Sequence, residues 1–255
     1  MNTSVIQSYK LYIKESWQTF KRNPLFILRV YIVVFVISSI FNFITKKVSV
    51  YHEQIPASSF FELVIALVGT YVNTLVWIGL TLVLIHLVRK ERAEIKELFK
   101  HSKKVLKVFL ASCLLVLGTI IGLCLLVVPG IIFFLTYQFA PFRLIEKDMS
   151  VKNAFEESAH MVQGKRWYLF GLYTMVLITW LIWMAFWSAI LALLIISSVH
   201  MSIVVIAVVL AFAGFLVFLP MLNLFYIHVY DIFVQKTFSR IENPQTVADS
   251  LPLAR

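Results

Sequence analysis

The polar residues of this sequence lack the spacing that enzyme chemistry requires. A hydrolase or transferase needs a nucleophile or a metal ion, together with partners that orient it. The six histidines are scattered, and none stands in an H-E-x-x-H or H-x-x-x-H arrangement that would place two metal ligands on one helix face. The carboxylates of Glu156 and Glu157 fit the solvated face of a surface helix, and no glycine-rich phosphate loop is present. We therefore expect a protein that is not an enzyme and that holds no cofactor and no metal.

Ion-coupled transport would leave an ionisable group deep inside an apolar segment. Arg143 and Asp231 fall near the ends of their apolar runs, where snorkelling of the side chain suffices to keep the charge in water. Asn73 and Asn223 are expected nearer the middle of theirs. These two asparagines could line a polar cavity of a passive or lipid-handling transporter. Alternatively, they form interhelical hydrogen bonds of roughly 1 kcal/mol each, with no transport role.

The most distinctive polar residues are basic, and they cluster in three short amphipathic segments. Each Lys or Arg near an anionic leaflet can contribute about 1 kcal/mol of binding free energy before screening. The middle segment carries the candidate lipid-binding residues Lys96, Lys100, Lys103, Lys104 and Lys107. The segments either hold acidic phospholipids at the cytoplasmic leaflet or only set the orientation of the protein. Acidic phospholipids are thus the expected partners, with a membrane protein as a further partner class.

The composition places all these residues in a membrane protein. Of the 255 residues, 60% are apolar and only 14% are charged, and the mean hydropathy is +0.88. A soluble domain carries about a quarter charged residues, and several uncharged runs exceed the ~20 residues that cross a bilayer. The net charge of +10 lies in short segments between the apolar runs, so we expect no binding of nucleic acid.

The apolar runs predict an all-α fold with six transmembrane helices and cytoplasmic interfacial amphipathic helices. We expect a single membrane domain over residues 1–240 and a poorly ordered cytoplasmic tail over 241–255. The expected interfacial helices cover residues 4–22, residues 89–104 and a segment between Ser150, the expected N-cap, and Gly164, the expected stop. The predicted spans are residues 25–45, 60–88, 108–128, 131–145, 168–196 and 203–234.

Pro129 and Gly130 are predicted to form the turn between the third and fourth spans, because a Pro-Gly pair is a turn signal. The fourth span, at residues 131–145, is short for a full crossing. It either begins within the turn, thins the bilayer locally or is partly re-entrant. In the third span, Gly118 and Gly122 allow close helix packing, which we expect within the monomer.

The distribution of charge predicts the orientation of the protein. On this map all 23 Lys and Arg residues except Lys46 and Lys47 face one side, and the positive-inside rule makes that side the cytoplasm. Both termini are then cytoplasmic. The same layout suggests an interfacial helix followed by a two-span hairpin, repeated three times. Any six-span protein that obeys the charge rule would show basic segments at these places, so the repeat stays an alternative.

The stretch from Leu125 to Trp167 resembles a signature region of a bacterial membrane family. The residues that carry the resemblance are Val128, Pro129, Gly130, Ala140, Pro141, Glu146, Ser150, Ala154, Ser158, Gly164 and Trp167. They resemble the YciC-like inner-membrane proteins of unknown function and the related membrane domain of some glycerophosphoryl diester phosphodiesterases. Tyr230-Asp231 is similar to the Tyr-Asp ending of the last span of that domain.

The resemblance implies a six-helix membrane module in the bacterial cytoplasmic (inner) membrane. It implies no catalysis, because the phosphodiesterase activity of such fusions belongs to a separate soluble domain. We therefore expect a multi-pass inner-membrane protein that acts as a non-enzymatic scaffold, accessory subunit or lipid-associated module. The alternative is a passive or lipid-handling transporter with a polar cavity near Asn73 and Asn223.

Overall fold

The computed structural model describes residues 3–52, 59–96, 104–196 and 201–242. Within these ranges the regular structure is helical, and no strand occurs. Six stretches are long and apolar enough to cross a membrane: Pro24–Ile44, Leu67–Val88, Val105–Leu125, Val127–Glu146, Arg166–Leu194 and Ser202–Gln235. The predicted all-helical, multi-pass membrane fold is therefore confirmed.

The helices pack in two compact units. The first contains α1 (Thr3–Arg22), α9 (Arg166–Ile196) and α10 (Met201–Glu242). We call it the α1–α9–α10 unit. The second, the α2–α8 unit, contains α2 (Pro24–His52), α3 (Ser59–Val88), α5 (Val105–Leu125), α6 (Val127–Tyr137), α7 (Ala140–Glu146) and α8 (Val151–Val162). One domain over residues 1–240 stays a prediction.

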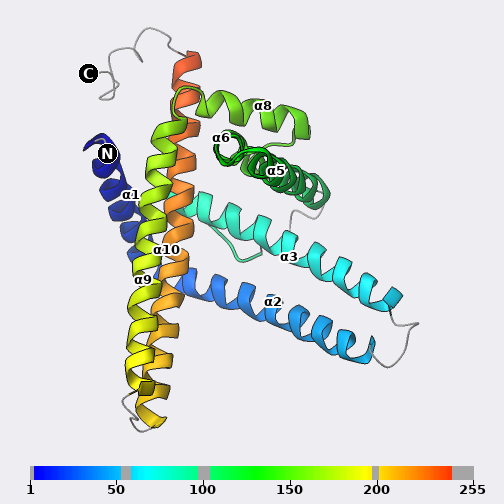
Figure 1. Cartoon of the computed structure of the whole chain (residues 1–255). Coiled ribbons are helices and arrows are strands. Elements are labelled where there is room, and N and C mark those ends of the chain that lie inside the picture. Colours follow the sequence, from blue (N-terminus) through cyan, green and yellow to red (C-terminus); the bar gives the residue numbers. More distant parts are fainter. Residues whose placement is uncertain (1–2, 53–58, 97–103, 197–200, 243–255) are drawn as a thin grey trace. The chain divides into compact units, whose positions relative to one another are not determined.

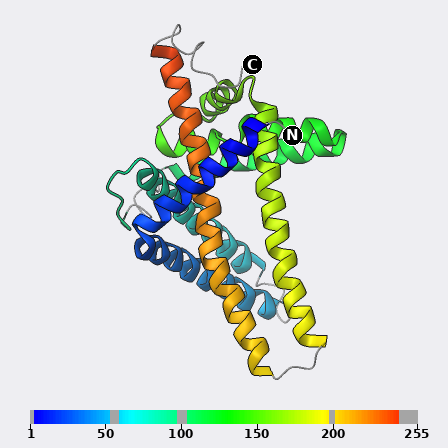
Figure 2. The same cartoon turned by 90° about the vertical axis from the view of Figure 1, so that its left-hand side faces the viewer.

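In the α1–α9–α10 unit, α9 and α10 run side by side as a hairpin, and α1 crosses them obliquely (Figures 1 and 2). The helix α1 is amphipathic. Its buried residues Val5, Tyr12, Ser16 and Thr19 recur at helical spacing, whereas Lys10 and Lys14 are exposed. The helix predicted over residues 4–22 is thus confirmed. Its place at the membrane interface stays a prediction.

In the α2–α8 unit, one apolar core joins α3, α5, α7 and α8. Its members are Ile78, Leu82, Val105, Val108, Ala111, Ala140, Leu144, Ile145 and Ala154. The helix α8 packs on this core as the amphipathic segment predicted there. Ser150 is its N-cap, accepting a hydrogen bond from the Asn153 backbone N–H at 3.2 Å, and Gly164 follows its end with a φ of 76°. The predicted start and stop of this helix are confirmed.

The turn predicted at Pro129-Gly130 lies instead at Leu126. This residue is extended, with φ −162° and ψ 142°, and it separates α5 from α6. Pro129 and Gly130 belong to the first turn of α6, where proline is tolerated because its missing N–H would have no intrahelical partner. Since α6 begins at Val127, the apolar stretch of the fourth span covers 20 residues, Val127–Glu146.

The prediction of an interfacial helix over residues 89–104 is wrong for the first half of that range. Residues 89–96 form turns and irregular chain, because α3 ends in a capping motif. The Glu91 N–H donates to the His86 carbonyl at 2.8 Å, and the Lys90 N–H donates to the Leu87 carbonyl at 3.2 Å. Lys90 adopts a left-handed φ of 61°, which turns the chain away from the helix axis. Residues 97–103 lie outside the described ranges.

The last predicted span, 203–234, is part of a longer helix. The helix α10 continues to Glu242, with Pro220 inside it. Of the tail predicted over 241–255, residues 241 and 242 therefore belong to α10, and residues 243–255 lie outside the described part of the chain. The threefold repeat of a surface helix and a hairpin is not evident in these elements and stays an alternative.

Candidate functional site

The helix α1 is held on α9 by hydrogen bonds and close packing. The Tyr9 and Thr179 hydroxyls lie 2.5 Å apart, and the Tyr12 and Tyr168 hydroxyls lie 3.2 Å apart. Burial raises the pKa of Tyr12 above its usual range, so this phenol stays neutral at physiological pH. Gly171 leaves room for Val5, whose Cγ1 atom would lie 3.3 Å from a Cβ atom built on the glycine.

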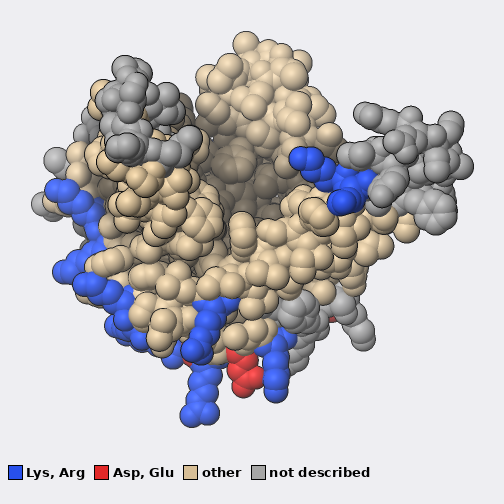
Figure 3. All heavy atoms as spheres, turned by 90° about the horizontal axis from the view of Figure 1, so that it is seen from below, with Lys and Arg blue, Asp and Glu red and all other residues tan. Residues whose placement is uncertain are grey.

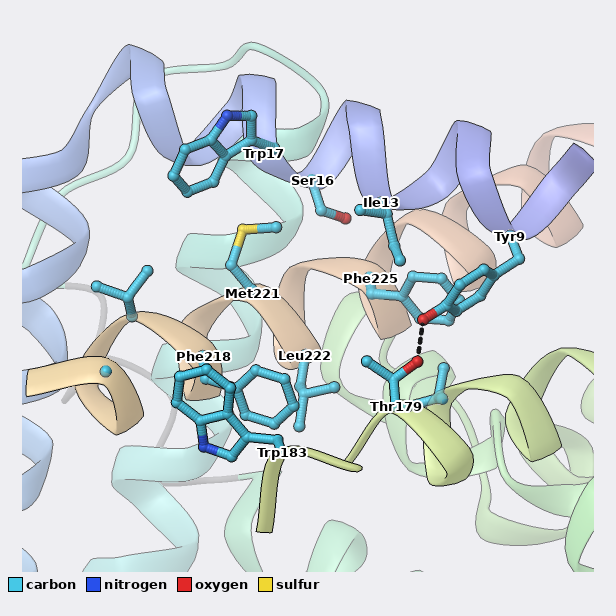
Figure 4. A pocket seen from close by; sticks show the side chains of 13 residues that line it. Tyr9, Ile13, Ser16, Trp17, Thr179, Trp183, Phe218, Met221, Leu222 and Phe225 are labelled. Atoms are coloured by element: carbon cyan, nitrogen blue, oxygen red, sulfur yellow. Dashed lines mark hydrogen bonds between the residues drawn. The ribbon is translucent and has the colours of Figure 1, made fainter. Parts of the chain in front are cut away.

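Between α1, α9 and α10 lies a cavity of about 390 Å³, which we call the α1 cavity (Figure 4). Its lining is almost wholly apolar. The lining residues are Tyr9, Ile13, Ser16, Trp17, Val176, Thr179, Trp183, Gly214, Val217, Phe218, Met221, Leu222 and Phe225. A cavity of this size falls in the range of small-molecule sites, and its lining suits an apolar chain.

One wall of the α1 cavity is aromatic. The rings of Trp183 and Phe218 stack with centroids 5.3 Å apart and planes at 2°. Gly214 lets the Trp183 indole approach α10, because a Cβ atom there would lie 2.9 Å from that ring. In the sequence, Trp180, Trp183 and Trp187 form a helical stripe that either packing or a lipid-facing surface would explain. Only Trp183 of the three lines the cavity. No sequence signal separated it from the other two, because the cavity needs α1 to form.

The α1 cavity contains one buried hydroxyl without a hydrogen-bond partner. Ser16 is 0% exposed, and its Oγ atom makes no hydrogen bond. Figure 4 places this hydroxyl on the side of α1 that faces the cavity. One turn further along, Thr19 Oγ1 lies 3.2 Å from His228 Nε2, and Glu15 lies 3.8 Å from His228 Nδ1. Buried polar groups normally find partners, so Ser16 is the exception in this region.

Of the five predicted lipid-binding lysines, two contact the end of α7 and the segment that follows it. The Lys104 ammonium group donates to the Ile145 carbonyl at 2.6 Å, and Lys107 pairs with Asp148 at 2.7 Å. Burial lowers the pKa of Lys104, and the hydrogen bond from Lys107 holds the pKa of Asp148 below its usual range. Lys96 is exposed. The remaining two, Lys100 and Lys103, lie outside the described residues.

Asn73 lines a second cavity, of about 530 Å³, in the α2–α8 unit. The Ser38 hydroxyl donates to Asn73 Oδ1 at 2.8 Å. The other lining residues are Val34, Thr70, Thr74, Trp77, Leu80, Phe109 and Ser112, so this cavity is more polar than the α1 cavity. Asn223 belongs to the other unit, where its amide donates to the Leu219 carbonyl at 3.2 Å. A cavity shared by the two asparagines stays a prediction.

Sequence reasoning missed an ion cluster around Arg143. This residue was expected to reach the interface from the end of its span. Instead it is 1% exposed. Its guanidinium donates to Glu146 at 2.9 Å and to Glu157 of α8, and Arg89 closes the cluster 2.5 Å from Glu146. Glu157 therefore has a buried partner, whereas its neighbour Glu156 pairs with exposed Lys152, at 3.8 Å. The cluster holds α7 and α8 together.

Among the described residues, the lining of neither cavity includes a His, Cys, Asp, Glu, Lys or Arg side chain. Among those residues, no group of three or more His, Cys, Asp and Glu side chains could hold a metal ion. The apolar lining of the α1 cavity suits an apolar chain, and the polar side chains around Asn73 suit a polar group. Comparison of the chain with family models, curated proteins and solved structures finds no match.

Proposed function

We propose that this protein is a non-enzymatic module of a bacterial inner membrane that associates with acidic phospholipids. The YciC-like resemblance of residues 125–167 supports the location. The observation that carries the proposal is α1, which buries one face against the α9–α10 pair and exposes Lys10 and Lys14 on another. Leu11 and Trp17 are also exposed on this helix, so its exposed part carries both apolar and basic side chains, as an interfacial helix does, and lysines attract anionic headgroups.

The surface of the described residues also favours lipid contact. Uncharged side chains make up most of the face in Figure 3. Large apolar residues are exposed on helices of both units, among them Phe35 and Val116 in the α2–α8 unit and Ile182 and Val209 in the α1–α9–α10 unit. Such surfaces are stable in hydrocarbon and costly in water. The exposed basic side chains would then attract the anionic headgroups of the surrounding lipids.

The test is native mass spectrometry of the protein released from its own membranes, with bound lipids identified. We expect acidic phospholipids to be enriched over their share of the membrane. The double substitution Lys10→Gln, Lys14→Gln is expected to reduce that enrichment. The matched control Lys46→Gln, Lys47→Gln removes the same charge from the predicted outer side and should leave it unchanged. Retention of a stoichiometric protein without lipid enrichment would contradict the proposal and favour an accessory subunit.

A second candidate function is passive transport through the α2–α8 unit. The observation that favours it is the cavity beside Asn73, where Ser38, Thr70, Thr74 and Ser112 supply further polar groups. Asn73→Leu would remove the amide and fill part of the cavity. If folding persists and uptake of small polar solutes by vesicles containing the variant is unchanged, the transport function loses its central residue. The neighbouring exposed position Tyr71 supplies the control, Tyr71→Leu.

A further inference from the structure

We propose that the α1 cavity holds one acyl chain of an acidic phospholipid, and that the Ser16 hydroxyl donates a hydrogen bond to the ester carbonyl of that lipid. The inference rests on the proposed lipid association. It goes further by naming the site, the part of the lipid that enters it and the polar contact that retains it.

The size of the cavity fits one chain. A buried apolar cavity of roughly 150 Å³ binds benzene, with its six carbons, which corresponds to about 25 Å³ per carbon. On that scale the α1 cavity, at about 390 Å³, holds on the order of fifteen carbons. This is the length of one fatty-acyl chain. A second chain of the same lipid would remain outside, in the bilayer.

The position of the cavity fits a lipid tail. Its walls come from Val176 to Trp183 of α9 and from Gly214 to Phe225 of α10, and both segments lie in helices apolar enough to span a membrane. An occupant that reaches the cavity from the bilayer must therefore be apolar. Because a tail in the bilayer is already in hydrocarbon, burial alone gives no preference for the cavity. Retention has to come from packing on the aromatic wall and from polar contacts.

Ser16 supplies the polar contact. A buried hydroxyl without a partner is costly, and the cost disappears when a ligand accepts its hydrogen bond. Ser16 is 0% exposed and unpaired on the cavity side of α1. The ester carbonyl of a phospholipid lies at the top of each acyl chain and accepts hydrogen bonds. A hydrocarbon or detergent tail without an ester would leave the hydroxyl unsatisfied.

The charge of α1 selects the headgroup. The same helix that lines the cavity through Ile13, Ser16 and Trp17 exposes the ammonium groups of Lys10 and Lys14 to the surroundings. A headgroup attached to a chain in the α1 cavity would lie beside this helix. Lysine side chains near the membrane surface attract anionic lipids, so phosphatidylglycerol fits better than a zwitterionic lipid.

The experiment uses the full-length protein in vesicles that contain phosphatidylglycerol with a photoactivatable diazirine in one acyl chain. After illumination, the crosslinked residues are mapped by peptide mass spectrometry. We expect crosslinks on the cavity side of α9 and α10, at residues such as Val176, Trp183 and Met221. Labelling confined to outward-facing residues such as Leu177 and Leu210, which are 53% and 57% exposed, would overturn the proposal.

Two sets of variants separate this site from general lipid association. Val176→Trp and Val217→Trp fill the cavity and should reduce cavity crosslinks several-fold, whereas Leu177→Trp and Leu210→Trp, on the outer faces of the same helices, should not. Ser16→Ala should also reduce them, and Ser188→Ala is the control because its hydroxyl donates to the Ala185 carbonyl in an exposed position. Thermal unfolding of each variant verifies that it is folded.

The two proposals fail in different ways. If the filling variants and Ser16→Ala keep the cavity crosslinks of the parent, the acyl-chain site is overturned, while acidic-lipid enrichment in native mass spectra would still support the proposed function. Cavity crosslinks that occur equally with phosphatidylcholine carrying the same diazirine would overturn the preference for an acidic lipid. If the parent protein shows no enrichment of acidic phospholipids in native mass spectra, both the acyl-chain site and the proposed function are overturned.

Discussion

A Cβ atom built on Gly122 would lie 2.7 Å from the Cα atom of Gly130, so α5 and α6 meet backbone to backbone. One turn earlier, a Cβ atom on Gly118 would overlap the Phe133 ring. The Gly118-x-x-x-Gly122 pattern therefore packs within the chain, as the sequence predicted. The tight turn at Leu126 depends on this approach, because a side chain at Gly122 would push the two helices apart.

We predict that Gly122→Leu destabilises the protein by about 1–3 kcal/mol, because overpacking at a close contact forces the backbone to move. Thermal unfolding in detergent measures the loss. The control is Cys124→Leu on the same helix, where the parent side chain is exposed. Equal melting temperatures for the parent protein and the Gly122 variant would show that α5 and α6 are not in contact.

The Arg143 cluster should be sensitive to the loss of one partner. Breaking a buried ion pair on one side costs about 3–5 kcal/mol, since the remaining charge stays buried. We predict a loss toward the lower end of this range for Arg143→Met, because Glu157 loses its buried partner whereas Glu146 keeps Arg89. Lys152→Gln breaks an exposed pair and should cost less than about 1 kcal/mol. Comparable effects of the two substitutions on the unfolding free energy would refute the buried cluster.

Lys90 occupies a backbone position that suits glycine. A left-handed φ costs a residue with a Cβ atom about 1 kcal/mol relative to glycine. We predict that Lys90→Gly stabilises the protein by up to this amount without changing the capping hydrogen bonds of α3. The control is Arg92→Gly, where no positive φ occurs and added backbone freedom should destabilise. A lower melting temperature for Lys90→Gly than for the parent would contradict the capping geometry.

The pair of Lys107 and Asp148 predicts a dependence of stability on pH. Lys107 lowers the pKa of Asp148 in the folded protein, so the folded state favours the carboxylate more than the unfolded state does. The pair's contribution is complete above the unfolded pKa near 3.8 and is lost as the pH falls through the lower folded value. Melting temperatures of the parent and Asp148→Asn should therefore differ at neutral pH and converge in acid. A difference that is the same at all pH values would contradict the ion pair.

Much of the secondary structure follows from local features of the sequence. The apolar runs predict the six membrane-spanning stretches, because a helix in hydrocarbon satisfies its backbone internally. Ser150 and Gly164 predict the ends of α8, because capping involves only neighbouring residues. The prediction of a reverse turn at Pro129-Gly130 is wrong, because proline fits the first turn of an α-helix as well as it fits a reverse turn. The prediction of a helix after Arg89 is wrong, because the pattern of charges does not specify the left-handed backbone conformation of Lys90.

The candidate sites depended on contacts between residues far apart in the sequence. Arg143 looked like an interfacial side chain until α8 brought Glu157 against it, and Trp183 looked like one member of a stripe until α1 closed the cavity beside it. Ser16 on α1 faces residues of α10 that lie some 200 positions later, such as Leu222. The order of the residues specifies which helix faces are apolar and where the charges lie. Which faces meet depends on the folded chain, because side-chain periodicity specifies the direction of a side chain along its own helix and not its partner on another.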